Sequence, residues 1–148
     1  MFDYSTLILD RTALDVARAT QKGTYDYTDF NRVVAALEDL SARLLAAGYT
    51  SPYVPVLVRH LDGTMTTEWR EDDESVVGSV IEEYRANVAA MRTALAVFPS
   101  TPFAPEDMKR FTWNEANAME QILADLDTLL NNMAAAWYYS GEIYTGEV

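Results

Sequence analysis

The stretch TDFNRVVAALEDLSARLLAAG, residues 28–48, decides the fold class of this chain. Its large apolar residues follow steps of four, three and four, which places them on one face of an α-helix. These residues are Val33, Leu37, Leu40 and Leu44. Thr28 stands where a hydroxyl caps a helix N-terminus, and Gly48 stands where a left-handed residue ends one. The stretch therefore predicts a helix that buries one face in a core.

Two longer segments show the same spacing, and a shorter helix is expected before them. The first helix is expected after Asp10 and before Gly23, so that residues 10–48 hold two helices. Residues 75–98 form the third, which Ser75 or Asp73 can cap and Pro99 stops, and residues 114–137 form the fourth. The apolar seam of the third helix packs within the chain or against a second copy. Its positions are Val77, Ile81, Tyr84, Val88, Met91, Leu95 and Phe98.

Residues 52–70 are the only segment with the character of β-strands. A valine-rich run, residues 53–61, and a returning strand, residues 64–69, flank Asp62 and Gly63, a favoured pair for a two-residue turn. An isolated hairpin is marginally stable in water, so this one must lean on helices or on another chain.

The fold class that follows is mostly α, a small helical bundle of about four helices with one β-hairpin appendage and extended termini. The 148 residues suit a single domain, 1–148, because this is close to the commonest domain size. Residues 1–9 form an N-terminal arm, and residues 138–148 form a C-terminal arm in which Gly141 and Gly146 favour an extended or turning backbone.

The composition excludes several classes of partner and site. The net charge of -12 repels a phosphate backbone and disfavours anionic membrane surfaces, so we expect no nucleic acid and no membrane as partner. No apolar run is long enough to span a bilayer, and the N-terminus lacks the pattern of a secretory signal. Cysteine is absent, so the chain has neither disulfides nor thiolate metal sites.

The sequence offers no catalytic, cofactor-binding or metal-ligating motif, so we expect a protein that is not an enzyme. His60 is the only histidine, and no nucleophile motif accompanies it. The acidic residues between Glu68 and Glu74 lack the spacing of a calcium loop. Phosphate-binding glycine loops are also absent.

Two helix starts resemble each other at an offset of 86 positions. Thr28 and Asn31 in the first align with Asn114 and Asn117 in the second, each pair preceded by an aromatic residue. We interpret Thr28 and Asn114 as N-caps, with Asn31 and Asn117 reaching back as in a capping box. The alternative is that the two asparagines form a ligand-binding pair.

Both ends of the chain are rich in large apolar residues, which water solvates poorly. They pack either on the chain's own bundle or on a neighbouring subunit. We therefore treat the following as candidate partner-binding residues: Phe2, Tyr4, Trp137, Tyr138, Tyr139, Ile143, Tyr144 and Val148.

Four segments also carry a resemblance to a known family: LILDRTALDVARA, YDYTDFNRVVAALEDLSARLLAAGY, YRANVAAMRTAL and PEDMKRFTWNEANAMEQILADLDTLLNNMAAAWYYSGEIYTGE. In order, they resemble a family of small proteins encoded in the tail modules of phages and prophages of Gram-positive, Clostridia-type bacteria.

The resemblance implies a structural component of the virion tail, an adaptor or spacer near the baseplate or the tail fibres. It would reside in the host cytoplasm before assembly, and it would contact other tail, baseplate or fibre proteins in multiple copies or as a homo-oligomer. The alternatives are a carbohydrate-binding or cell-wall-acting accessory of the tail and a small host-directed regulatory binding protein.

Overall fold

The computed structural model describes residues 1–73, 78–109 and 111–146, and the side chains of all of these except residues 78–79 and 137–146. It is a mostly α fold with one two-stranded hairpin, as the sequence predicts. Along the chain the elements are η1 (Tyr4–Thr6), α1 (Ala13–Ala17), α2 (Tyr27–Ala46), β1 (Val58–Arg59), β2 (Met65–Thr66), η2 (Glu71–Asp73), α3 (Gly78–Arg92) and α4 (Trp113–Gly146).

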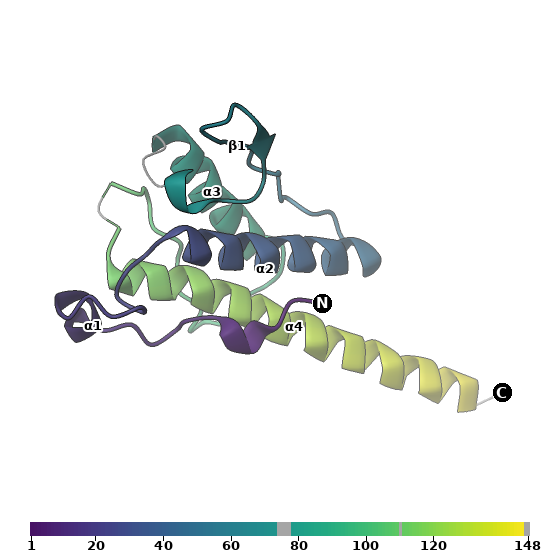
Figure 1. Cartoon of the computed structure of the whole chain (residues 1–148). Helices are drawn as coiled ribbons and strands as arrows, with labels where there is room; N and C mark the ends of the chain where they lie inside the picture. The colour runs from purple at the N-terminus through teal and green to yellow at the C-terminus, as the bar shows by residue number, and fades with distance from the viewer. Residues whose placement is uncertain (74–77, 110, 147–148) are drawn as a thin grey trace.

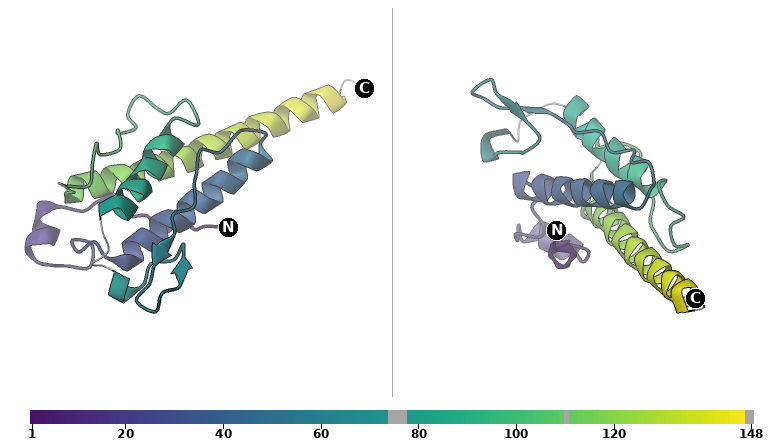
Figure 2. Two further views of the ribbon diagram at one scale, coloured as in Figure 1. Left: turned by 90° about the horizontal axis from the view of Figure 1, so that it is seen from above. Right: turned by 90° about the vertical axis from the view of Figure 1, so that its right-hand side faces the viewer.

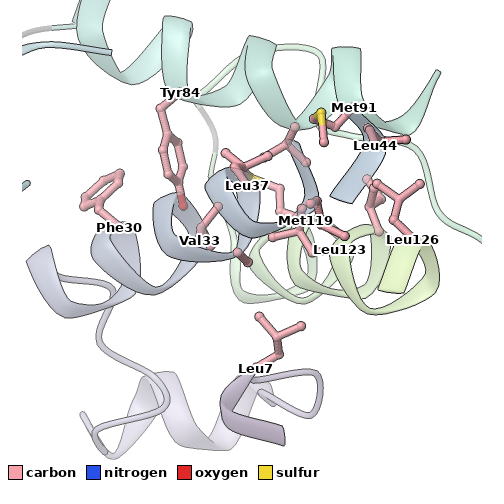
Figure 3. Packing of buried hydrophobic residues seen from close by; sticks show 14 of the residues in the cluster. Leu7, Phe30, Val33, Leu37, Leu44, Tyr84, Met91, Met119, Leu123 and Leu126 are labelled. Atoms are coloured by element: carbon pink, nitrogen blue, oxygen red, sulfur yellow. The ribbon is translucent and has the colours of Figure 1, made fainter. Parts of the chain in front are cut away.

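Helices α2, α3 and α4 pack against one another and form the body of the molecule. Helices α2 and α4 begin at the same end and run in the same general direction (Figures 1 and 2). Helix α3 lies on one side of this pair, and the N-terminal segment with η1 lies on the other, where Leu7 enters the core (Figure 3). The N-terminal arm is thus mostly extended, and it is packed on the body.

The predicted apolar faces converge in this core. The seam of α3 packs within the chain, because Tyr84, Val88 and Met91 are buried against α2 and α4. Val77 lies outside the described residues. The remaining core residues of the two long helices include Val33, Leu37, Leu40 and Leu44 from α2 and Met119, Ile122, Leu123, Leu126 and Leu130 from α4 (Figure 3).

The predicted helix caps are wrong at both repeated starts. Asp26 is the N-cap of α2, and its side chain and that of Asp29 form a capping box, so Thr28 lies inside the helix. Thr112 occupies the corresponding place before α4, and its hydroxyl accepts from the backbone N–H of Glu115 at 3.4 Å. An acidic residue three positions after the cap competes better for the backbone donors of the first turn. Asn114 lies inside α4, and Asn31 and Asn117 bond elsewhere.

Helix α1 is shorter than expected at both ends, and its cap is Thr12 instead of Asp10. Thr12 and Asp15 form a capping box, and the helix ends at Ala17. Ala19 then takes a left-handed conformation with φ of 50°, which turns the chain back toward Gly23. A Cβ on Gly23 would lie 2.2 Å from the backbone oxygen of Asp15, so only glycine fits this close return.

Helices α3 and α4 end at other places than predicted. Helix α3 ends at Arg92 and does not reach Phe98. The Arg92 guanidinium donates to the backbone oxygens of Thr101 and Pro102, which holds the segment after the helix against the helix end. The capping role of Ser75 falls outside the described residues. Helix α4 continues through Gly146, so the predicted end at residue 137 and an extended backbone over 138–146 are wrong. A glycine inside a helix costs only about 1 kcal/mol, which a long helix tolerates.

The hairpin is confirmed, but its strands are shorter and its loop longer than predicted. Val58 pairs with Thr66, and Arg59 pairs with Met65, in antiparallel register. The backbone N–H of His60 bonds the oxygen of Thr64 at 2.9 Å, so three residues form the loop, with Gly63 at φ of 86°. Three-residue loops that end in a left-handed glycine are the next most common after the two-residue turns.

Candidate functional site

Two arginines and two carboxylates form a buried cluster between the N-terminal segment, α2 and α4. The Glu120 side chain is fully buried and accepts from Arg11 at 2.5 Å and from Arg32 at 2.6 and 3.0 Å. Its Oε1 also accepts from the backbone N–H of Ile8 at 3.1 Å. Asp29 bonds the same two arginines at 3.2 and 2.5 Å. We call these four side chains the ion quartet.

The charges of the ion quartet are matched within the cluster. Burial lowers the pKa of Arg32, but its bonds to Glu120 and Asp29 raise it more, so the guanidinium stays charged. Because every carboxylate oxygen accepts at least one bond, the two carboxylates of the ion quartet are engaged within the chain, and the cluster holds the N-terminal segment on the body.

Three asparagines fix segments without regular structure by bonding both backbone groups of one residue. Asn31 accepts from Trp69 N–H at 2.7 Å and donates to its oxygen at 2.8 Å. Asn117 does the same for Arg11 at 3.1 and 2.9 Å. The equivalent positions of the sequence repeat therefore have equivalent roles, and these are not the predicted capping.

The third member is Asn87, which sequence reasoning missed. It bonds Val54 N–H at 2.9 Å and its oxygen at 2.8 Å. The signal in the sequence was an asparagine on the core-facing side of a predicted helix. Such an amide is buried in the structure, and a buried amide needs a polar partner. We call Asn31, Asn87 and Asn117 the asparagine clamps.

His60 is buried, and it connects the hairpin to η2. Its Nδ1 lies 2.6 Å from Asp73 Oδ2, and its Nε2 lies 2.6 Å from Thr66 Oγ1. Carboxylate, imidazole and hydroxyl in this order also occur in nucleophilic hydrolases. Here the Thr66 hydroxyl additionally donates to the backbone oxygen of Glu68 at 3.2 Å, so it is engaged within the hairpin. The arrangement therefore holds the hairpin closed.

Other classes of site find no support among residues 1–73, 78–109 and 111–146. No group of three or more histidine or acidic side chains in these residues could hold a metal ion. None of their helices is long and apolar enough to cross a membrane.

The N-terminal candidates for partner binding are used within the chain. Phe2 and Tyr4 are half-buried and stack edge to face with ring centroids 4.9 Å apart. The Tyr4 hydroxyl donates to Asp39 at 2.8 Å, and Arg43 lies over the Tyr4 ring at 5.7 Å. Burial, together with the bond to Asp39, raises the pKa of Tyr4 well above its ordinary value. The arm thus covers the outer face of α2.

The C-terminal candidates lie on the helix that projects from the body. Helix α4 extends past the ends of α2 and α3 (Figures 1 and 2). The backbone of Trp137, Tyr138, Tyr139, Ile143 and Tyr144 belongs to this helix, whereas their side chains and all of Val148 fall outside what the structure describes.

An apolar groove lies at the base of this projection, between the end of α2 and α4. Its volume is about 450 Å³. Tyr49 in its wall remains 40% exposed, and Met1 is fully exposed. The lining residues are Met1, Arg43, Ala46, Ala47, Tyr49, Leu130, Asn131, Met133 and Ala134. We call this cavity the base groove. It was not predicted, because it arises where α2 ends and α4 continues.

Comparison of the chain with protein-family models, with curated proteins and with solved structures finds no match.

Proposed function

We propose that the chain is a non-enzymatic structural component of a phage tail, an adaptor or spacer that works through contacts with other proteins. The observation that carries this proposal is the shape of α4. Its first half is a core helix, and its second half extends beyond the other helices (Figure 1). A body that is internally locked, with one projecting helix, suits a part that docks into an assembly.

The polar side chains of the body support the same conclusion. The ion quartet, the asparagine clamps and His60 all bond to groups of the chain itself. The large apolar side chains that remain exposed at the base groove, Met1 and Tyr49, are instead of the types enriched in interface cores. Together with the resemblance of the sequence, these features favour assembly over catalysis.

The test is a mass-spectrometric inventory of purified tails from a phage or prophage that encodes the chain. We expect the protein in intact tails at a fixed ratio to its neighbours. A second arm uses a chain that lacks residues 138–148, whose body we expect to remain folded by circular dichroism while its incorporation is lost. Leu61→Asp at the exposed hairpin loop is a matched control, since it alters an apolar residue far from α4. Absence of the full-length protein from purified tails would refute the assignment.

A further inference from the structure

The projecting half of α4 includes a long uncharged stretch in a strongly acidic chain. From Thr128 to Gly141 no residue carries a charged side chain, although the chain as a whole has a net charge of -12. Two copies of this chain repel each other over most of their surfaces, because like charges oppose close approach. The uncharged stretch is where that repulsion is weakest.

The apolar face of α4 loses its cover along this stretch. Leu126 and Leu130 are buried by the body, Met133 is half-buried and Ala134 is exposed. The same alternation of four and three positions continues to Trp137 and Tyr144 along the helix. A face that is apolar in register with the core, yet lies beyond the ends of α2 and α3, is the face that a partner helix would cover.

We propose that this partner is a second copy of the chain, and that the two α4 helices pair antiparallel. The tip of each helix would lie in the base groove of the other copy. From Leu130 at the groove to Gly146 near the tip, the helix rises about 24 Å at 1.5 Å per residue. One two-fold axis near the middle of this length would fill both grooves at once and would close the assembly as a dimer.

Charge favours the antiparallel over the parallel arrangement. Glu142 lies near the tip, and a parallel pair would bring this acidic residue of the two copies together. The antiparallel pair separates the two Glu142 residues and places each tip beside a groove lined by one basic residue, Arg43.

The base groove supplies exposed apolar surface for such a contact. Met1 is fully exposed, Tyr49 is 40% exposed, and Met133 is half-buried. A specific interface buries roughly 800 Å² per partner, so the length of α4 beyond Ala134 has to contribute the remaining area.

This inference rests on the proposed assembly role and deepens it by naming the partner. The dimer and the tail location are tested by separate measurements. Sedimentation of the purified full-length protein tests the dimer, whereas the tail inventory tests the location. A monomer that occurs in tails would overturn only the dimer, and a dimer that is missing from tails would overturn only the tail assignment.

The decisive variant is Ala134→Glu, which places a carboxylate in the base groove at an exposed helical position. We expect the native protein to sediment as a dimer and Ala134→Glu to weaken the dimer at least tenfold. Ala35→Glu is the matched control, because Ala35 is also exposed but lies on α2 away from the groove. A monomeric native protein, or an equal effect of the two variants, would overturn the proposal.

The orientation is tested by cysteine pairs, which the absence of native cysteine makes specific. We expect a mixture of Ala134→Cys and Gly141→Cys chains to form a mixed disulfide dimer, because both positions lie on the apolar face of α4 and would face each other across the two-fold axis. Ala134→Cys alone should remain uncrosslinked, since the antiparallel pair separates the two copies of this position. Efficient self-crosslinking of Ala134→Cys would show a parallel pair and would overturn the antiparallel arrangement.

Discussion

Replacing Glu120 with glutamine tests whether the ion quartet holds the N-terminal segment on the body. Glutamine keeps the volume of the side chain but removes its charge, and its amide nitrogen cannot accept from an arginine. Arg11 and Arg32 would then share the single carboxylate of Asp29. The bond from Ile8 N–H to Glu120 is also affected.

The structure sets the size of the effect. The side chain of Arg11 is only 2% exposed, whereas that of Arg32 is 14% exposed. Arg11 therefore cannot recover its lost partner from water, while Arg32 can do so in part. Breaking a buried ion pair on one side costs about 3–5 kcal/mol, and the partial exposure of Arg32 favours the lower end of this range. We expect Glu120→Gln to lower the free energy of unfolding by about 3 kcal/mol, equivalent to a fall in Tm of roughly 6–12 °C.

The assay is urea unfolding followed by circular dichroism, with Glu83→Gln as control. Glu83 is exposed on α3, so its variant makes the same change in net charge without touching the cluster. We expect the control to change the free energy of unfolding by less than about 0.5 kcal/mol. If both variants unfold within about 1 kcal/mol of the native protein, the ion quartet does not have the structural role argued for it.

Three further changes have defined outcomes. Asn31→Ala leaves a backbone N–H and a backbone oxygen without their partner, so we expect urea unfolding to show a loss of about 2–4 kcal/mol, against almost none for the exposed Asn132→Ala. Gly23→Ala would force a Cβ to 2.2 Å from the Asp15 oxygen, so we expect a Tm lower by several degrees, and an unchanged Tm would refute the close contact. Burial raises the pKa of Tyr84, so its contribution to stability is full below the unfolded pKa of about 10 and is lost above it by about 1.4 kcal/mol per pH unit. Tyr84→Phe should reduce this alkaline slope in unfolding measured from pH 9 to pH 12, and an unchanged slope would contradict the assignment.

The sequence predicts the helical body well because its signal is local. The spacing of Val33 and Leu37, or of Met119 and Leu123, is a property of one helix, and burial follows wherever such faces meet. The end of α2 was equally predictable, since Gly48 takes the left-handed conformation that its position favours. The buried ion quartet was harder to predict from the sequence. Glu120 bonds residues 88 and 109 positions away, and no local pattern marks which of 23 acidic residues will be buried with arginines.

The end of α4 shows the limit of local reasoning most clearly. Glycine is a frequent helix terminator, and the sequence predicts an extended or turning backbone around Gly141 and Gly146. A glycine stops a helix only when the following chain gains more by turning away than by continuing, and no proline or strong cap follows here. The helix therefore continues at a cost of about 1 kcal/mol per glycine.

This continuation also decides where a partner can bind. The N-terminal segment is held by the ion quartet, by the Asn117 clamp and by the packing of Leu7, Phe2 and Tyr4, so freeing it would break several buried bonds at once. The projecting half of α4 extends past the ends of α2 and α3 (Figure 2), so a partner could cover it while the bonds that hold the N-terminal segment stay intact. A contact that removes apolar surface from water without disrupting the fold is favoured over one that must first undo it. For that reason a partner should meet this chain at the far end of α4, with the N-terminal segment remaining on the body.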